Sequence, residues 1–327
     1  MRIVIPGGTG QVGRILDRAL SAEGHDVLVL TRRPRRDREL YWDGRTLGHW
    51  AEAIDGSDAV INLAGRSVNC RYTRANQREM LTSRVDSTRV VGRAVAAARK
   101  PPRVWLQMST ATIYAHRFGA PHDERAGVLG GGEPDAPRSW DASIAIARAW
   151  EQAQQEAATP DTRKVALRCA MVMSPDRGGA LDLMLRLARY GFGGPIDGGA
   201  QYMSWIHDRD LVRAVGFLLE RDDLAGPVNL AAPHPLPQRA FMRALRHAGG
   251  IPVGLPATRW MAEIGAFALR SDTELLLKSR SVVPGRLHAA GFGFEHPHWP
   301  EAAADLVRRM RREPVPAGGG PARTMAR

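Results

Sequence analysis

Residues 2–13 read RIVIPGGTGQVG, and this stretch decides the fold. The apolar run at residues 3–5 predicts a buried β-strand, and the glycines that follow predict a tight turn opening into a helix. Glycine allows positive φ and a close backbone approach to a pyrophosphate, which the helix N-terminus attracts. We therefore predict a dinucleotide-binding turn in which the contacts come from Gly7, Gly8, Thr9, Gly10, Gln11, Val12 and Gly13.

Strand and helix patterns alternate along the first two thirds of the chain. Strands are predicted at 3–5, 27–30, 59–63, 104–108 and 165–172, and helices at 10–22, 49–54, 78–98 and 144–157. This order predicts an α/β fold with a doubly wound parallel Rossmann sheet and a smaller C-terminal substrate lobe. We expect the Rossmann domain at 1–175, completed by a strand near 228–232. The lobe is expected at 176–305, with a disordered tail at 313–327.

The residues after the second predicted strand distinguish NAD from NADP. NAD-binding proteins usually carry an acidic residue there that accepts the ribose hydroxyls, whereas this chain has Thr31, Arg32 and Arg33. Two guanidinium groups suit a 2′-phosphate, although surface arginines are common in this sequence. The sequence therefore favours NADP(H).

Composition excludes several classes of function. The net charge of +12 comes almost entirely from arginines that are spread along the chain, so nucleic-acid binding is not favoured. Cys70 and Cys169 match no metal-binding spacing, so no metal site is predicted. The strand at the N-terminus leaves no room for a signal peptide, and no apolar run is long enough to cross a membrane. We expect a cytoplasmic protein without membrane partners.

Several further segments resemble the extended short-chain dehydrogenase/reductase superfamily, within which the chain is similar to atypical "epimerase family" proteins of the YfcH type. The resemblance covers about residues 1–305. It is carried by the glycine motif and by residues 58–65 (DAVINLAG), 71–73 (RYT), 83–85 (SRV), 109–114 (STATIY), 150–151 (WE), 178–181 (GGAL), 204–207 (SWIH) and 256–297. The last of these resembles that subgroup's small C-terminal domain, at about 250–300.

This resemblance implies an NADP(H) cofactor that passes close to Leu63, Ala64 and Gly65. It also places Thr110 at the Ser/Thr position that holds the substrate oxygen, with Ser109 beside the cofactor. The superfamily transfers its proton with a Tyr whose pKa is lowered by a Lys four residues later.

The expected Tyr-x-x-x-Lys helix is altered in this chain. Alignment on Trp150 and Glu151 puts Ser143 at the Tyr position and Ala147 at the Lys position, and neither can do that chemistry. Tyr114 is a candidate replacement phenol, with Arg84 or Arg168 as the cation that lowers its pKa. Tyr114 can equally be a packing aromatic.

Other polar residues are candidates for a substrate pocket. Arg71, Arg84 and Arg168 lie in or beside motifs of the family and would hold an anionic substrate, or else pair with acidic side chains. Trp205 and His207 are also assigned to this pocket, with His207 either a general base or the start of a helix. The glycine-rich loop at 127–137 is either a cover over the site or an exposed insertion.

The sequence thus predicts an NADP(H)-dependent oxidoreductase or epimerase-like enzyme with a non-standard active site. It acts on a small molecule, which is anionic if the three arginines face the pocket, and whose identity the sequence does not give. The alternative is a non-catalytic NADP(H)-binding regulator or a cell-division-associated protein. The oligomeric state is not predicted.

Overall fold

Seven parallel strands form the central sheet of the computed structural model, which describes residues 1–134, 136–268, 272 and 274–312. Their order across the sheet is β10-β6-β5-β4-β1-β2-β3. Chain progression reverses between β1 and β4, and this switch point is where doubly wound sheets bind ligands. The strands are β1 (Arg2–Pro6), β2 (Asp26–Thr31), β3 (Glu39–Tyr41), β4 (Ala59–Asn62), β5 (Val104–Thr110), β6 (Arg163–Cys169) and β10 (Gly226–Leu230).

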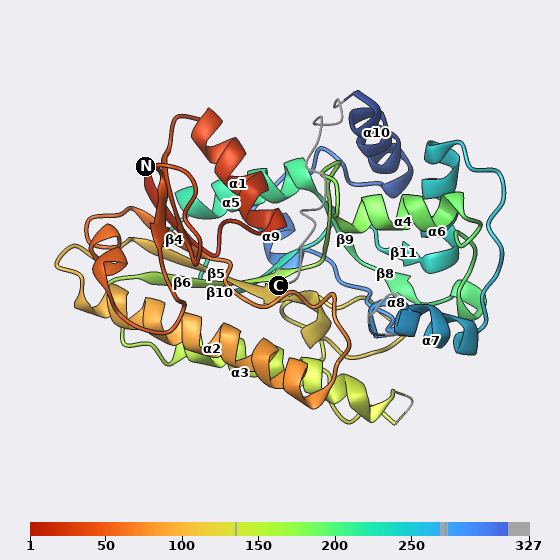
Figure 1. Cartoon of the computed structure of the whole chain (residues 1–327), viewed down its shortest axis with the longest axis horizontal. Helices are drawn as coiled ribbons and strands as arrows, with labels where there is room; N and C mark the ends of the chain where they lie inside the picture. The colour runs from red at the N-terminus through yellow and green to blue at the C-terminus, as the bar shows by residue number, and fades with distance from the viewer. Residues whose placement is uncertain (135, 269–271, 273, 313–327) are drawn as a thin grey trace, which may run out of the picture.

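Helices cover both faces of this sheet (Figure 1). One face carries α1 (Gln11–Ala22) and α5 (Asp208–Glu220), and the other carries α2 (Arg74–Ala97) and α3 (Asp141–Gln155). Because both faces are covered, the strands are apolar on both sides, as in the fully buried residues Ile3, Val4 and Ile5. The α/β fold with a doubly wound Rossmann sheet is therefore confirmed.

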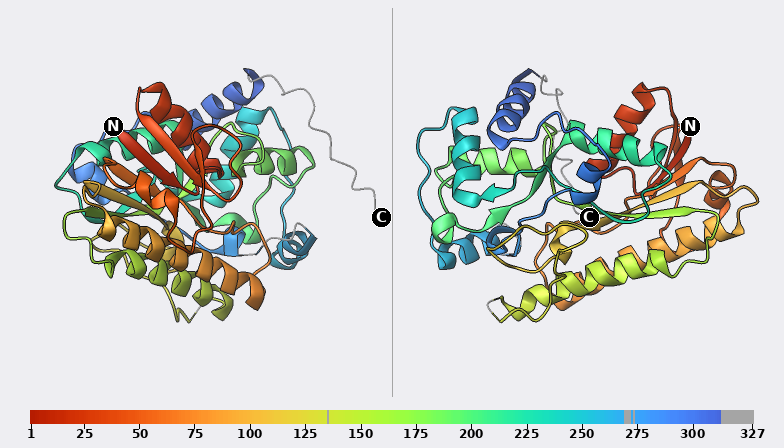
Figure 2. Two further views of the ribbon diagram at one scale, coloured as in Figure 1. Left: turned by 60° about the vertical axis from the view of Figure 1, so that its left-hand side comes forward. Right: turned by 180° about the vertical axis from the view of Figure 1, so that it is seen from behind.

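A smaller lobe lies at one end of the sheet (Figures 1 and 2). Its core centres on Trp299, whose ring stacks on Phe241 at 3.9 Å and meets Trp205 edge-on at 4.9 Å. The indole N–H of Trp299 donates to the carbonyl of Phe241 at 2.9 Å, so this large ring is buried with its polar atom satisfied.

The elements of this region are helices and two short two-stranded sheets. The helices are α4 (Ala180–Arg189), α6 (Gln238–Gly249), α7 (Arg259–Ala268), α8 (Glu274–Leu277) and α10 (Trp299–Arg312). Helix α9 (Gly285–Ala289) packs instead against β10, with Leu287 in the core of the large sheet. The strand pairs are β7 (Met171–Met173) with β9 (Trp205–His207), and β8 (Tyr202–Met203) with β11 (Leu236–Pro237).

Element boundaries differ from the predictions in ways that have local causes. Helix α2 begins at Arg74 rather than near 78, because the Thr73 side chain caps it by accepting the N–H of Asn76 at 3.2 Å. Strand β3 was not predicted, since three residues are too short to show a period. Both α5 and β10 pack in the sheet unit although they follow residue 175, and the predicted tail at 313–327 lies outside the described residues.

Buried Asp210 ties the C-terminal region to α5. Its side chain is fully buried and accepts the backbone N–H groups of Glu295 at 2.8 Å and His296 at 2.9 Å. Arg213 supplies a further bond at 3.1 Å. Charged hydrogen bonds of this kind are stronger than neutral ones, and losing the acceptor would leave two N–H groups without their partner.

We expect Asp210→Ala to lower the free energy of unfolding by about 2–4 kcal/mol, because it removes this shared acceptor. Urea denaturation monitored by circular dichroism measures the change. The control is Asp223→Ala, which removes an exposed ion pair with Arg221 and should leave the midpoint nearly unchanged. If the two substitutions lowered the free energy of unfolding equally, Asp210 would not be the residue that holds the C-terminal region to α5.

Candidate functional site

The turn between β1 and α1 packs too closely for side chains at two of its glycines. Gly7 has φ of +77°, and a Cβ there would lie 2.7 Å from the Cα of Ala64. A Cβ on Gly13 would lie 2.2 Å from the carbonyl oxygen of Gly8. Helix α1 begins after Gly10 with no side-chain cap, so its first N–H groups face the turn without a side-chain partner. This cradle suits the phosphates of a dinucleotide.

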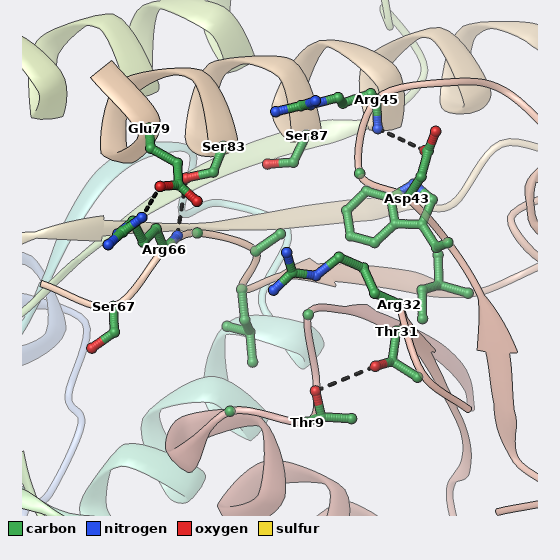
Figure 3. Close-up of a pocket in the computed structure, with 18 residues that line it drawn as sticks. Thr9, Thr31, Arg32, Asp43, Arg45, Arg66, Ser67, Glu79, Ser83 and Ser87 are labelled. Carbon is green, nitrogen blue, oxygen red and sulfur yellow. Dashed lines mark hydrogen bonds and ion pairs between the residues drawn. The ribbon is translucent and has the colours of Figure 1, made fainter. Parts of the chain in front are cut away.

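A cleft of about 540 Å³ opens above this turn (Figure 3). Its walls are the loops after β1, β2 and β4, the segment that follows β3, and the first half of α2. The lining residues are Gly7, Thr9, Gly10, Leu30, Thr31, Arg32, Trp42, Asp43, Gly44, Arg45, Leu63, Ala64, Gly65, Arg66, Ser67, Glu79, Ser83 and Ser87.

Most of the predicted cofactor residues line this cleft, and some do not. The predicted residues that are not part of its walls are Gly8, Gln11, Val12, Gly13, Arg33 and Ser109. Gln11 instead donates to the hydroxyl of Ser174 at 3.1 Å.

Basic side chains gather at the end of the cleft beside β2. Figure 3 shows Arg32 extending across the cleft, with Thr31 below it bonded to Thr9 at 3.4 Å. Arg33 is exposed and lies outside the walls. Arg45 lines the same end and lies 3.9 Å from Asp86. No carboxylate of the described residues forms an ion pair with Arg32, so its charge is available to an anion.

A second, smaller cavity of about 220 Å³ adjoins the cleft. The two have no lining residue in common, but they meet along residues 63–68 and along α2, which supply neighbouring residues to each. The lining residues are Val68, Tyr72, Met80, Arg84, Met108, Ser109, Thr110, Thr112, Ser143, Ile146, Ala147 and Trp150. The structure thus brings Thr110, Ser109 and Arg84 together with the altered positions Ser143 and Ala147.

The hydroxyls at the end of β5 have different surroundings. Thr110 is partly exposed in the cavity and accepts the N–H of Thr112 at 3.1 Å. Ser109 is buried and donates to Glu151 at 2.6 Å. Thr110 therefore keeps its hydroxyl proton free for a substrate oxygen.

A buried acidic group stands where the family would place its Tyr–Lys pair. Ser143 on α3 donates to Oε2 of Glu274 at 2.5 Å, and Glu274 is fully buried on α8. Burial raises the pKa of this carboxyl. Lys278 lies 3.5 Å from the other oxygen of Glu274 and donates to the carbonyl of Thr112 at 2.9 Å, while burial lowers its pKa to about 8.

Tyr72 supplies a phenol to the same cavity. It precedes α2, is half-buried, and lines the cavity with Ser143. Burial raises the pKa of Tyr72, and the charge of Glu274 adds to this effect. The phenol is therefore protonated at neutral pH and can serve as a proton donor.

Arg84 brings a buried positive charge to the opposite side of the cavity. Its guanidinium lies 4.8 Å above the Trp150 ring and donates to the carbonyl of Met80 at 3.0 Å. Burial lowers its pKa to about 10, so it remains charged at pH 7. Within the described part of the chain, no carboxylate forms an ion pair with Arg84. Such a cation is suited to an anionic ligand.

Tyr114 and Arg168 lie behind the cavity rather than in its walls. The Tyr114 hydroxyl donates to Asn229 at 2.9 Å and accepts from Arg168 at 3.0 Å, and burial raises its pKa. Arg168 pairs with Glu151 through two bonds, at 2.9 and 2.8 Å. Tyr114 therefore packs as a buried aromatic and Arg168 pairs with an acidic side chain, which are the alternatives that the sequence left open for these residues. We assign neither residue a chemical role.

The other residues predicted for the substrate pocket also lie away from it. Trp205 and His207 are fully buried, and His207 caps α5 by accepting the N–H of Arg209 at 3.1 Å. Burial lowers the pKa of His207 to about 4, so its imidazole is neutral at pH 7. Arg71 is exposed before α2. None of these three side chains lines either cavity. For Trp205 and His207 the reason is that β9 and the residues around it form part of the interior of the lobe.

Sequence reasoning missed Arg45, Tyr72, Glu274 and Lys278. Arg45 follows the unpredicted strand β3. Tyr72 lines the cavity, whereas Glu274 and Lys278 contact its wall residues Ser143 and Thr112, and all three arrive there only through tertiary packing. Tyr72 belongs to the motif at 71–73, but its distance from Ser143 in the sequence gave no sign that the two side chains meet.

The described part of the loop at 127–137 is held at several points. The N–H of Ala115 donates to the carbonyl of Val128 and the N–H of Gly130 to that of Ile113, both at 2.9 Å, and Arg148 donates to the carbonyl of Gly130 at 2.8 Å.

Among the described residues, no helix is long and apolar enough to span a membrane.

Comparisons with known proteins agree with this geometry. A model of the NAD dependent epimerase/dehydratase family matches residues 3–231, and a domain of unknown function, DUF1731, matches residues 259–306. Epimerase family protein SDR39U1 of Bos taurus is 33% identical over 312 residues, which is 94% of this chain and 100% of the relative. The Homo sapiens protein of the same name is 30% identical over 311 residues, with the same coverage.

Solved structures show the same fold. The human epimerase family protein SDR39U1 (isoform 2), crystallised with NADPH, superposes with a TM-score of 0.82 at 28% identity, covering 94% of this chain and 99% of that one. A nucleoside-diphosphate sugar epimerase from Corynebacterium glutamicum gives 0.74 at 24% identity, covering 94% and 58%. The chain therefore belongs to the NAD dependent epimerase/dehydratase family, and it carries the DUF1731 domain at its C-terminal end.

Proposed function

We propose that the chain is an NADP(H)-dependent oxidoreductase or epimerase-like enzyme that acts on a small carbonyl or alcohol substrate bearing an anionic group. One observation carries this proposal. The nucleotide cleft adjoins a separate cavity in which a hydroxyl, a phenol and a buried unpaired cation line the walls, in Thr110, Tyr72 and Arg84. A protein that only bound a nucleotide would not need this second cavity.

The cleft fits NADP(H). Gly7 and Gly13 allow the turn to pack against the backbone of Ala64 and Gly8, and a turn of this shape suits a pyrophosphate. Arg32 lines the cleft after β2, the position from which a cation would meet a 2′-phosphate. The human relative crystallised with NADPH supports the same choice. When bound, this cofactor supplies a hydride donor or acceptor at its nicotinamide ring.

Side chains of the protein then supply the proton that the substrate oxygen takes up in the reductive direction. Thr110 holds the substrate oxygen through its free hydroxyl proton, and Tyr72 donates a proton to that oxygen in the reductive direction. Ser143 connects Tyr72 to Glu274, which can hold the exchanged proton away from solvent. This arrangement replaces a lysine-activated phenolate with a phenol kept neutral by burial, so it favours proton donation over proton abstraction.

Arg84 selects the substrate. Its buried charge faces a cavity of about 220 Å³, which is large enough for only a small molecule. A carboxylate or phosphate on the substrate would restore the charge balance that no protein side chain provides.

The alternative function, a non-catalytic NADP(H)-binding regulator, is favoured by one feature. Ser143 and Ala147 stand at the positions of the Tyr–Lys pair, so the family's usual proton donor is missing. Such a regulator would bind NADPH tightly but would not oxidise it with any substrate.

Arg32→Ala should weaken NADPH binding about 10- to 100-fold and leave NADH binding unchanged, because only the 2′-phosphate meets this guanidinium. Titration by tryptophan fluorescence or calorimetry measures both nucleotides. Arg33→Ala is the matched control, since Arg33 is exposed and outside the cleft walls. Equal loss of NADPH and NADH affinity in Arg32→Ala would contradict the NADP assignment.

Tyr72→Phe should lower kcat for NADPH oxidation at least about 100-fold while NADPH affinity stays constant, because the proton donor is lost. The assay uses NADPH absorbance with a panel of 2-keto acids and phosphorylated carbonyl compounds. Thr110→Ala should behave similarly, whereas Tyr114→Phe removes a phenol that lies behind the cavity and should retain activity.

The same assay separates the two functions. If the wild-type protein binds NADPH tightly but oxidises it with no member of the panel, the regulator is the better description. If Tyr114→Phe loses turnover and Tyr72→Phe keeps it, the protein is an enzyme but our choice of proton donor is wrong.

A further inference from the structure

A second cluster of ligand-type side chains lies in the C-terminal half, outside both cavities. His207, at the end of β9, His296, between α9 and α10, and Asp305 on α10 each offer one donor atom, and these atoms lie within 4.8 Å of one another. His207 is fully buried and Asp305 is 7% exposed. Three segments far apart in sequence therefore converge on one point.

The donor atoms at this point lack hydrogen-bond partners. Nε2 of His207, Nε2 of His296 and Oδ2 of Asp305 are all buried, and no described group completes a hydrogen bond to any of them. The closest approach is 3.3 Å, between Nε2 of His207 and Oδ2 of Asp305. Buried polar atoms are nearly always satisfied, so three together require an explanation.

Neighbouring groups hold these side chains in place. Nδ1 of His207 lies 3.1 Å from Oδ1 of Asp208, and Arg309 holds Asp208 through two bonds of 2.7 Å. Because Nδ1 also accepts the backbone N–H of Arg209, Nε2 carries the ring proton when no metal is bound. On metal binding that proton moves to Nδ1, where the Asp208 carboxylate can accept it, and Nε2 is then free to bind the ion.

The other two donors are also positioned. Arg308 binds the outer oxygen of Asp305 at 2.5 Å, and the backbone N–H of His296 donates to buried Asp210 at 2.9 Å. Arg309 lies 3.6 Å from Oδ2 of Asp305, an ion-pair contact that is longer than a hydrogen bond, so this buried oxygen keeps a lone pair for a metal.

We propose that His207, His296 and Asp305 bind a divalent transition-metal ion, with Zn²⁺ the best match to two imidazoles and one carboxylate. In a tetrahedral zinc site the ligand atoms lie about 3.3 Å apart, so the cluster must contract slightly around the ion. The imidazoles are stacked at 3.7 Å, so one ring must turn out of the stack before both nitrogen lone pairs point at one centre. A water molecule completes the fourth position.

The site has a structural consequence that is independent of the nucleotide. It links the start of α5, which covers the sheet, to α10, which covers the lobe. An ion bound only by the folded chain stabilises it by mass action. The metal therefore clamps the C-terminal helix onto the rest of the molecule.

The test uses the full chain, freed of metal with EDTA and then titrated with Zn²⁺ alone. We expect one ion per chain by competition with a chromophoric chelator, a raised Tm, and a Co²⁺ spectrum typical of four-coordinate geometry. His296→Phe keeps an aromatic ring for stacking and should weaken binding at least about 100-fold. Asp208→Asn, a positioning change, should weaken it about 10- to 100-fold.

The control variant is His234→Asn combined with His298→Asn. These histidines are exposed and stacked at 4.5 Å, so they could bind metal at the surface. The proposal requires this variant to bind Zn²⁺ like the wild type. It is overturned if the wild type binds no ion, if His296→Phe binds as tightly, or if the control variant loses binding. The metal-free Tm of each variant shows that it is folded.

Discussion

The close approach of the glycine turn to the end of β4 is the constraint on which the binding site depends. A Cβ on Gly7 would stand 2.7 Å from the Cα of Ala64, so these two segments can pack only with a bare backbone at the turn. Their contact closes the floor of the cleft at the switch point of the sheet. It also fixes the path of residues 63–68, a segment that runs from the wall of the cleft to the wall of the smaller cavity. A Cβ on Gly65 would lie 3.2 Å from the Arg84 side chain, so the backbone passes equally close to this buried cation.

The C-terminal domain contributes directly to the interior of the Rossmann half. Glu274 and Lys278 are both almost fully buried, and they contact Ser143 and the carbonyl of Thr112. Burying such a pair has a large desolvation cost, which its mutual attraction offsets only in part. A purely structural contact would be made more simply by apolar side chains. The charges therefore fit a role beside the cavity, where they replace polar groups that α3 no longer provides.

The fold was predictable because its signals are local and periodic. The strands at 3–5, 59–63 and 104–108 are short apolar runs. The glycine turn after the first of them indicates that they form a dinucleotide-binding parallel sheet. Strand β3 escaped prediction because it is only three residues long. The start of α2 depended on a single capping threonine, Thr73, which a periodicity argument does not weigh.

The candidate site was predictable only where it follows the family's pattern. Thr110 and Arg32 occupy positions fixed by strand ends, so their placement follows from the topology. Tyr72 and Glu274 come from segments 202 positions apart, and only tertiary packing brings them to Ser143. Tyr114 shows the opposite failure. It lies four residues after Thr110, yet its ring turns inward to Asn229 and Arg168, because the chain bends through the 3₁₀ helix Ala111–Ile113.

The replaced positions on α3 also explain why the charges around the cavity are arranged as they are. In the family's pattern one lysine both lowers the pKa of the tyrosine and adds positive charge beside the substrate. Here Ala147 removes that charge, and the only buried cation in the described cavity wall is Arg84, on the α2 side. Burial meanwhile raises the pKa of the Tyr72 phenol, and the charge of Glu274 adds to this effect, so the phenol stays protonated. Arg84 and Tyr72 both line this cavity, so under the proposed function the anionic group of the substrate would face Arg84 while its reacting oxygen meets the phenol.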